Sequence, residues 1–319
     1  MPSFRGFDMN EGADKNSEFN ALVVLGATAV GKTTYAVKAA LRHNGEIISA
    51  DSRQVYRGLD IGTGKDLNEY GSVPYHLIDI CPPEKEYNLF DFQKDAYTAF
   101  TAIRSKGRLP VFAGGTGLYL DSVIRKYELV PVPENAALRE ELSRKPMEEL
   151  QTLLLALKPD IHNKTDLEQR DRLIRAVEIA EYKRLHPEAA EAAVANRPDI
   201  RPYIKGLRFP RTVLKERIKK RLLERIDAGM IEETKRLHDE GLSWERLESF
   251  GLEYKFTALY LQNKIGTKER YIEELYRAIC AFAKRQETWF RRMEKNGVRI
   301  DFIECERGLP DSEFRLPFP

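Results

Sequence analysis

Cysteine is scarce in this sequence, and long apolar runs are absent. The 319 residues include three cysteines, Cys81, Cys280 and Cys305. Their odd number and wide separation exclude a disulfide framework and a paired metal-ligand motif. We therefore expect ordinary buried or half-buried thiols in a reducing cytoplasm. No apolar run approaches the roughly 20 residues that a membrane-spanning helix needs, so the sequence predicts no membrane association.

The first nineteen residues lack the apolar block of a secretory signal and contain four acidic residues, Asp8, Glu11, Asp14 and Glu18. This composition argues against a signal or transit peptide. We expect residues 1–19 to be a disordered tail and residues 306–319 to be a second tail. The sequence also lacks internal repeats and low-complexity segments.

Charge is distributed unevenly, although the net charge is only +2. Residues 201–300 contain 24 Lys and Arg against 15 Asp and Glu, whereas residues 1–200 contain 26 against 30. A basic segment of this size suggests a polyanionic partner such as nucleic acid. Solvated helices whose charges only face water explain the same pattern, and charge alone does not separate the two interpretations.

The most specific motif is Gly-Ala-Thr-Ala-Val-Gly-Lys-Thr at residues 26–33, directly after the apolar run 21–25. It fits the pattern G-x-x-x-x-G-K-[ST] between a predicted strand and a predicted helix. Such a loop directs backbone N–H groups and a lysine at phosphate oxygens, and its last hydroxyl can ligate Mg²⁺. The sequence therefore predicts a di- or triphosphate site, with Mg²⁺ on Thr33. The predicted phosphate-binding residues are Gly26, Thr28, Ala29, Val30, Gly31, Lys32 and Thr33.

Strand-like and helical segments alternate through the first third of the chain, which predicts an α/β fold with a mostly parallel sheet. Strands are expected at 22–25, 46–50, 76–80 and 109–113, and helices at 35–41 and 89–105. We expect a P-loop NTPase-like core in two parts, residues 20–125 and 200–305, around a helical insertion at 126–199. Within these parts, 187–210 is expected to be a connection, and 211–240 and 268–295 to be long helices.

Two further predicted strands end in unusual residues, and ligands of such sheets bind at the carboxyl ends of the strands. The segment 49–56 contains Asp51, and the segment 114–117 is Gly-Gly-Thr-Gly. Asp51 suits a metal ligand, a general base or a turn cap. The glycine-rich segment suits a tight turn or a site in which Thr116 donates a hydrogen bond to a phosphate oxygen.

Arginine recurs every four residues in the first of the two long helices, at Arg217, Arg221 and Arg225. Three guanidinium groups on one helix face can bind phosphates. The alternative is pairing with the acidic residues of the same segment, Glu216, Glu224 and Glu232. The last long helix presents Lys284 and Arg285, which are candidates for contacts with an RNA backbone.

Taken together, these segments resemble the tRNA dimethylallyltransferase (tRNA isopentenyltransferase) family. The matching segments span almost the whole chain, and a P-loop followed by Asp-Ser-x-Gln-Val-Tyr is highly specific. The family usually has Gly-Tyr where this chain has Gly-Leu-Glu-Tyr at 251–254. The resemblance rests on residues 26–33, 47–63, 73–80, 91–96, 114–119, 172–179, 217–221 and 283–291.

This resemblance implies transfer of a dimethylallyl group from dimethylallyl diphosphate to N6 of an adenosine beside a tRNA anticodon. Asp51 would remove the proton from the amino group. Lys32, the loop amides, Mg²⁺ on Thr33, Thr116 and Arg221 would stabilise the departing diphosphate.

The resemblance also implies how the tRNA is held. Ser52, Arg53 and Gln54, with Asp51, would recognise the flipped adenine. The insertion would clasp the anticodon stem-loop through Arg172 and Arg175, and Lys284 and Arg285 would contribute elsewhere. We expect a cytoplasmic monomer without the zinc module of the longer eukaryotic form.

Three alternatives share part of this pattern. An adenylate isopentenyltransferase would use free AMP, ADP or ATP, but the basic second half and the insertion favour tRNA. A small-molecule kinase that binds ATP would not need the residues at 51–54. A paralogue that binds tRNA without catalysis would not need to retain the proposed catalytic residues.

Overall fold

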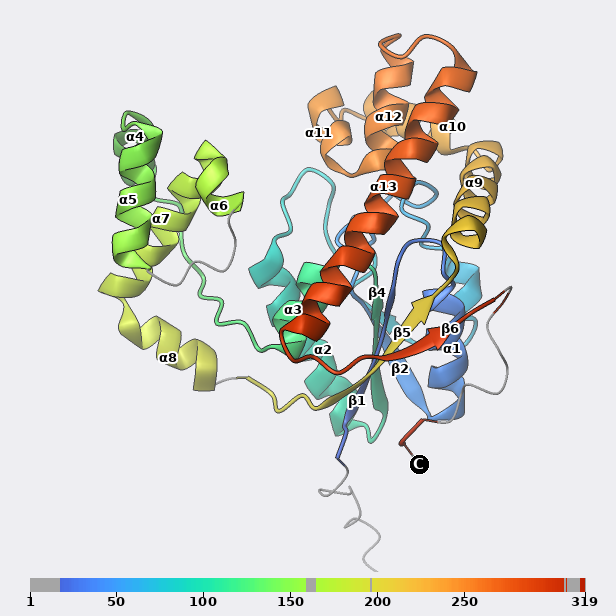
Figure 1. Ribbon diagram of the computed structural model, residues 1–319, viewed down its shortest axis with the longest axis horizontal. Coiled ribbons are helices and arrows are strands. Elements are labelled where there is room, and N and C mark those ends of the chain that lie inside the picture. Colours follow the sequence, from blue (N-terminus) through green and yellow to red (C-terminus); the bar gives the residue numbers. More distant parts are fainter. Residues whose placement is uncertain (1–17, 159–164, 196, 307, 309–315, 319) are drawn as a thin grey trace, which may run out of the picture. The chain divides into compact units, whose positions relative to one another are not determined.

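The computed structural model describes residues 18–158, 165–195, 197–306, 308 and 316–318. The chain forms two compact units (Figure 1). One combines residues up to Arg125 with those from Pro198 onward, and the other is Lys126–Arg197. Most of the two predicted tails lies outside the described residues.

The first unit is built on a six-stranded sheet in the order β3-β2-β4-β1-β5-β6, and all neighbouring strands run parallel. The predicted α/β fold with a parallel sheet is confirmed. In this order β1 lies between β4 and β5, and β4 lies between β1 and β2, so three of the strands that carry sequence motifs are neighbours. The strands are β1 (Ala21–Gly26), β2 (Gly45–Ser49), β3 (Tyr75–His76), β4 (Leu109–Gly114), β5 (Pro202–Arg208) and β6 (Asp301–Glu304).

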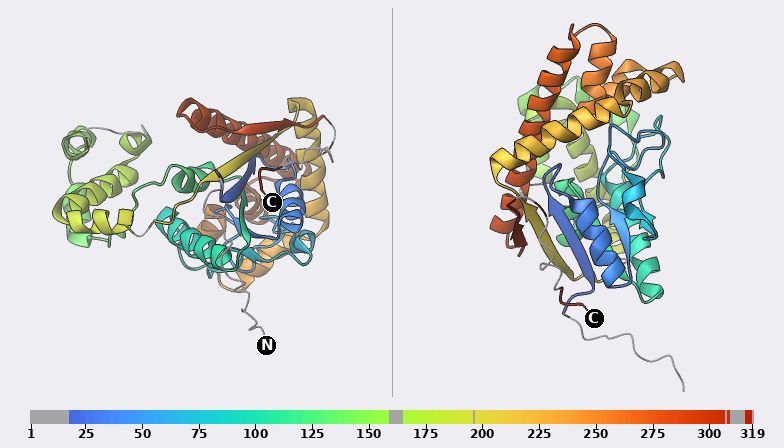
Figure 2. Two further views of the ribbon diagram at one scale, coloured as in Figure 1. Left: turned by 90° about the horizontal axis from the view of Figure 1, so that it is seen from below. Right: turned by 90° about the vertical axis from the view of Figure 1, so that its right-hand side faces the viewer.

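Helices cover both faces of this sheet because its strands are apolar on both sides. On one face, Leu22, Val24 and Val111 pack with α1 (Lys32–Arg42), α9 (Arg211–Asp227) and the first half of α13 (Lys268–Lys295). On the other face, Val23 and Phe112 pack with α2 (Leu89–Ser105), α3 (Gly117–Ile124) and the end of α13. Figure 2 shows the sheet between these layers. The long helix α13 thus contributes to both cores.

Several local predictions are confirmed. The helix α2 has the predicted bounds, and Asn88 and Asp91 form a capping box at its start. The apolar side chains that recur every four residues along α9 are buried, namely Leu214, Ile218, Leu222 and Ile226. Cys81 and Cys305 are buried and Cys280 is half-buried, all as free thiols.

Other local predictions are wrong. The strand expected at 76–80 ends at His76, because Leu77 and Asp79 adopt left-handed backbone with φ of 65° and 57°. The helix expected over 211–240 divides at Gly229 (φ 102°) into α9 and α10 (Met230–Asp239). The expected connection 187–210 contains a helix, α8 (Pro187–Ala195), and the strand β5, which pairs with β1.

The remaining helices of the first unit enclose a smaller core. These helices are α10, α11 (Trp244–Ser249) and α12 (Leu252–Leu261), whereas the short 3-10 helix η1 (Leu67–Tyr70) packs with α1 through Tyr70. Val55, Tyr56 and Leu59 from the segment after β2 pack against this group. None of the helices within the described ranges is long and apolar enough to cross a membrane.

The second unit is helical and has its own core of leucines, isoleucine and valine, including Leu150, Leu154 and Leu173. Its buried Glu178 forms ion pairs with Arg139 and Arg175. These attractions hold the pKa of Glu178 below its ordinary value, against the opposing effect of burial. The unit comprises α4 (Ala136–Ser143), α5 (Met147–Leu157), α6 (Thr165–Glu168), α7 (Arg170–Leu185) and α8.

Candidate active site

One cavity in the first unit is lined by the loops that follow β1, β2 and β4. Because these strands are parallel neighbours, their carboxyl ends meet at one edge of the sheet. The cavity is closed further by the segment 60–70 and by residues of α9 and α13. Sequence motifs separated by more than 200 residues thus face the same space.

The first of these loops, residues 27–31, joins β1 to α1. Gly31 is in the left-handed region (φ 87°) and precedes the first turn of α1, where no side chain caps the helix within the described residues. The first N–H groups of α1 are therefore available, and a helix amino terminus with free N–H groups favours an anion. Arg217 of α9 fixes the loop by donating from Nε to the carbonyl oxygen of Ala29 over 2.8 Å.

Lys32, the first residue of α1 after this loop, has a strongly lowered side-chain pKa. Its pKa is lowered from the ordinary value of 10.5 to about 8, first by burial and then by the positive charge of Arg221, while Asp51 acts in the opposite direction. The Nζ atom donates to the carbonyl oxygen of Ala27 over 2.7 Å. A bound anion would stabilise the charged form of Lys32 and offset both the burial and the repulsion from Arg221. The position of Lys32 therefore favours binding of a phosphate group.

Asp51 and Thr116 lie on the loops after β2 and β4. Oδ1 of Asp51 accepts the backbone N–H of Arg53 over 2.9 Å, so the turn-cap interpretation is correct for this one oxygen. The backbone N–H of Ser52 donates to Oγ1 of Thr116 over 3.0 Å and joins the two loops. The second carboxylate oxygen of Asp51 makes no hydrogen bond within the described residues and remains available for a substrate proton.

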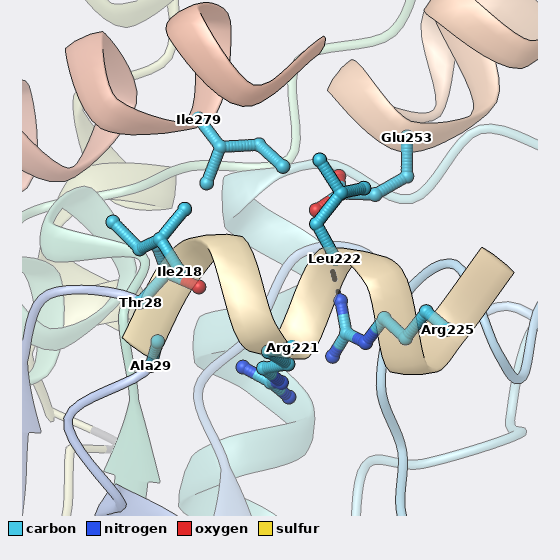
Figure 3. A pocket seen from close by; sticks show the side chains of 8 residues that line it. All are labelled: Thr28, Ala29, Ile218, Arg221, Leu222, Arg225, Glu253 and Ile279. Carbon is cyan, nitrogen blue, oxygen red and sulfur yellow. Dashed lines mark ion pairs between the residues drawn. The ribbon is translucent and has the colours of Figure 1, made fainter. Parts of the chain in front are cut away.

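The arginines of α9 do not pair with the acidic residues that the sequence offered as partners. Arg221 pairs with Asp66 (3.1 Å) and Arg225 with Glu253 (3.7 Å). Figure 3 shows both arginines on α9, with Arg221 on the side of Thr28 and Ala29 and Arg225 on the side of Glu253, and with the Arg225–Glu253 ion pair marked. Burial, followed by repulsion from Arg221, lowers the pKa of Arg225 to about 10. The two guanidinium groups therefore form a positive wall of the cavity, which favours a polyanionic ligand.

The predicted site residues are only partly brought together. Gly26 and Val30 are buried and shape the phosphate loop from behind, whereas the other predicted phosphate-binding residues line the cavity. Of the predicted RNA contacts on α13, Arg285 lines the cavity and Lys284 is exposed elsewhere on the helix. In the second unit, Arg172 is exposed.

Two predicted tRNA-binding residues have intramolecular partners that the sequence did not indicate. Arg175 pairs with Glu178 and donates to the carbonyl oxygen of Val132 over 2.8 Å. Both ends of the Gln54 amide are engaged: Oε1 accepts from Ser49, and Nε2 donates to the carbonyl oxygen of Gly64 over 3.0 Å. Their contacts with RNA stay predictions, and the structure shows what holds each side chain in place.

Gln286 of α13 is the most informative residue that sequence reasoning missed. Its Oε1 accepts the backbone N–H of Thr28 over 2.9 Å, and its Nε2 donates to the carbonyl oxygen of Gly115 over 2.8 Å. One buried side chain thus joins the phosphate loop to the loop after β4. Trp289, one turn further, packs on Gly117 so closely that a Cβ there would lie 2.4 Å from the indole ring. In the sequence, Gln286 and Trp289 were indicated only by their place in segment 283–291, which resembles the family.

Thr33, the predicted Mg²⁺ ligand, lies in the first turn of α1 and lines the cavity. Tyr70 lines the same cavity, and burial raises the pKa of its phenol well above the ordinary value. No group of three or more His, Cys, Asp or Glu side chains capable of holding a metal occurs in the described part of the chain. A metal here would therefore depend on phosphate oxygens, water and Thr33, a donor set that Mg²⁺ accepts.

Comparisons with known proteins identify the relatives of this chain. Residues 54–293 match the family model described as IPP transferase, and residues 19–71 match the one described as isopentenyl transferase. The chain is 67% identical over 288 residues to tRNA dimethylallyltransferase 2 of Treponema denticola, covering 90% of this chain and 97% of that protein. The chain belongs to the tRNA dimethylallyltransferase family.

Other relatives extend this family assignment. The tRNA dimethylallyltransferase of Treponema pallidum is 54% identical, with 92% of this chain and 94% of that protein covered. The crystal structure of a tRNA isopentenylpyrophosphate transferase from Bacillus halodurans superposes with a TM-score of 0.67 at 35% identity, covering 92% of this chain and 93% of that one. A eukaryotic dimethylallyltransferase acting on tRNA shares the fold, with a TM-score of 0.73 at 23% identity over 91% of this chain and 74% of that one.

Proposed function

We propose that this family member transfers a dimethylallyl group from dimethylallyl diphosphate to N6 of an adenosine next to the anticodon of tRNA. The observation that carries the proposal is the single cavity that holds the phosphate loop, Arg221 and Asp51 together. The relatives are named for transfer to tRNA. They do not support the alternative in which a free adenylate is the acceptor.

In the proposed reaction, N6 of adenine forms a bond to C1 of the dimethylallyl group while the bond from C1 to the diphosphate oxygen breaks. The proton leaves N6 for the free oxygen of Asp51. Delocalisation of the N6 lone pair into the ring makes the amino group a weak nucleophile, so proton removal assists the attack. The electron pair of the broken bond departs with the diphosphate.

Stabilisation of the leaving diphosphate is the larger requirement, because the allylic carbon reacts with carbocation character. Lys32, Arg221 and the first N–H groups of α1 face the same cavity. The Thr116 hydroxyl accepts the N–H of Ser52 over 3.0 Å and donates to Oγ of Ser52 over 3.4 Å. The second hydrogen bond is long, and a phosphate oxygen would replace Ser52 as the acceptor of this proton. Charge stabilisation from prepositioned donors needs no reorganisation during the reaction. Mg²⁺, held by Thr33 and the diphosphate, would neutralise further negative charge.

Recognition of tRNA is proposed to combine two contributions. Residues 201–300 supply the excess positive charge, and Arg285 of this segment reaches the cavity. The unit 126–197 contains 12 Lys and Arg against 14 Asp and Glu. It therefore offers no general positive field, and its contact with the anticodon stem-loop would rest on single residues such as Arg172.

Labelled dimethylallyl diphosphate with Mg²⁺, offered to unmodified tRNA and to AMP in parallel, tests the proposal. We expect label in tRNA at an adenosine adjacent to the anticodon, and none in AMP. Label in AMP alone would make the protein a free-nucleotide prenyltransferase. Label in neither acceptor, with tRNA bound, would indicate a binding protein without catalysis.

A further inference from the structure

The segment Asp60–Asp66 forms one wall of the cavity but has no helix or strand of its own. The N–H groups of Gly64 and Lys65 donate to carbonyl oxygens within the segment, those of Ile61 and Asp60. Its other buried N–H groups need partners elsewhere, because an unpaired buried N–H group is costly. The partner for three consecutive N–H groups is one carboxylate, Glu233 of α10. Oε2 accepts from Asp60 (3.0 Å) and Ile61 (2.9 Å), and Oε1 accepts from Gly62 (3.1 Å).

Glu233 is only 7% exposed, and a fourth donor completes its surroundings. The phenol of Tyr254 in α12 donates to Oε1 over 2.6 Å. Burial, reinforced by Glu233, raises the pKa of Tyr254 well above its ordinary value, so the phenol keeps its proton. The ring of Tyr254 also lies against Gly62, where a Cβ would approach it to 2.6 Å. Two helices outside the phosphate loop thus fix the backbone of this segment.

Three further contacts of the same segment are made with residues that line the cavity. The carbonyl oxygen of Gly64 accepts from Gln54, and Asp66 pairs with Arg221. A Cβ on Gly64 would lie 1.5 Å from Nη2 of Arg225 and 2.5 Å from Nη2 of Arg221, so both guanidinium groups pack on this glycine. The proposed adenine-recognising loop and the proposed diphosphate arginine are therefore aligned by one short segment.

We propose that Glu233 is a positioning residue for the transfer reaction: it holds residues 60–62 so that Gly64 and Asp66 orient Gln54 and Arg221. This inference rests on the proposed function. Glu233 itself is buried against the protein and touches no reacting atom. The exposed Arg221–Asp66 pair is individually weak, so its geometry depends on the anchored backbone, and a diphosphate can displace Asp66 at little cost.

Glu233→Gln tests the inference, because it keeps the size of the side chain but turns an NH₂ group towards backbone N–H donors. Glu232→Gln is the matched control: it removes the same charge from an exposed neighbour in the same helix. We expect kcat for prenyl transfer to fall about ten- to a hundredfold in Glu233→Gln, at temperatures where circular dichroism shows the variant folded. Glu232→Gln should retain the kcat of the unaltered protein.

A double-mutant cycle with Arg221→Ala separates positioning from general destabilisation. If Glu233 acts through Arg221, the effect of Arg221→Ala on kcat should shrink at least about threefold in the Glu233→Gln background. Fully additive effects, or equal kcat in the two glutamine variants, would overturn the inference. Absence of transfer by the unaltered protein would instead refute the proposed function, so the two failures are distinguishable.

A milder variant keeps the test available if Glu233→Gln does not fold. Tyr254→Phe removes one donor and leaves the three backbone hydrogen bonds in place. We expect faster amide hydrogen exchange in the peptide 60–66 together with a kcat lowered about twofold or more. Unchanged exchange and unchanged kcat would contradict the anchoring role.

Discussion

Replacement of Lys32 by methionine should have opposite effects on stability in the absence and presence of diphosphate. In the ligand-free protein, burial and Arg221 lower the pKa of Lys32 from 10.5 to about 8. The folded protein thus holds the charged lysine less favourably than the unfolded chain does. Methionine has nearly the same shape without the charge, so Lys32→Met should stabilise the ligand-free protein.

The magnitude follows from the pKa difference. A difference of one in pKa corresponds to about 1.4 kcal/mol, which gives a cost of about 3 kcal/mol for the charged lysine at neutral pH. Residual exposure of the side chain reduces this cost, and loss of the hydrogen bond to Ala27 opposes the gain by about 1 kcal/mol. We therefore expect a net stabilisation of about 1 to 2 kcal/mol, or a rise in Tm of about 4 °C for a unit of this size.

The stability difference between Lys32→Met and the unaltered protein should depend on pH in a defined direction. Between about pH 8 and pH 10.5 the unfolded chain binds more protons at Lys32 than the folded protein does, so this residue makes stability increase with pH over that range. The advantage of Lys32→Met should be constant below about pH 7 and should decline as pH rises through 8 towards 10.

Thermal unfolding at pH 6.5, 8 and 9.5, with and without magnesium pyrophosphate, provides the assay. Pyrophosphate should raise the Tm of the unaltered protein and leave that of Lys32→Met almost unchanged. A ligand-free variant that is less stable than the unaltered protein at pH 6.5 would refute the argument. A stability difference that does not depend on pH would refute it as well.

Four further predictions concern the reaction and the partner. Asp51→Ala should abolish prenyl transfer while pyrophosphate binding, measured by calorimetry, stays within about threefold; retained turnover would exclude Asp51 as the base. Arg221→Ala should lower kcat by about a hundredfold or more with a smaller effect on tRNA affinity in filter binding, and a pure binding defect would contradict its role at the leaving group. Gln286→Leu should lower kcat about tenfold because it leaves the Thr28 N–H and the Gly115 carbonyl without their bridge, and single-turnover rates equal to those of the unaltered protein would argue against this link. Raising salt from about 50 to about 200 mM should weaken tRNA binding at least about tenfold because of the basic segment 201–300; a flat response would point to a small acceptor.

The elements with strong local signals could be predicted from the sequence. The phosphate loop, α2 with its capping box and α13 depend on interactions between residues close in the chain, namely loop glycines, an Asn–Asp cap and a repeated apolar stripe. The carboxyl-end rule also placed Asp51 and Thr116 beside the phosphate loop. That prediction succeeded because parallel neighbouring strands align their ends by geometry alone.

What the sequence did not reveal depends on contacts between distant residues. The strands β5 and β6 contain charged residues that hide a strand pattern. In the folded protein β5 pairs with β1, and β6 pairs with β5. Gln286 and Glu233 look like ordinary polar residues of charged helices, yet each accepts backbone N–H groups from a loop more than 170 residues away. The local sequence was enough to predict the phosphate-binding loop and the main helices and strands, because the motifs that specify them lie within single loops, helices and strands. Tertiary structure alone decided which buried polar side chains hold the loops in place, because a backbone donor is satisfied by whichever acceptor the fold brings to it.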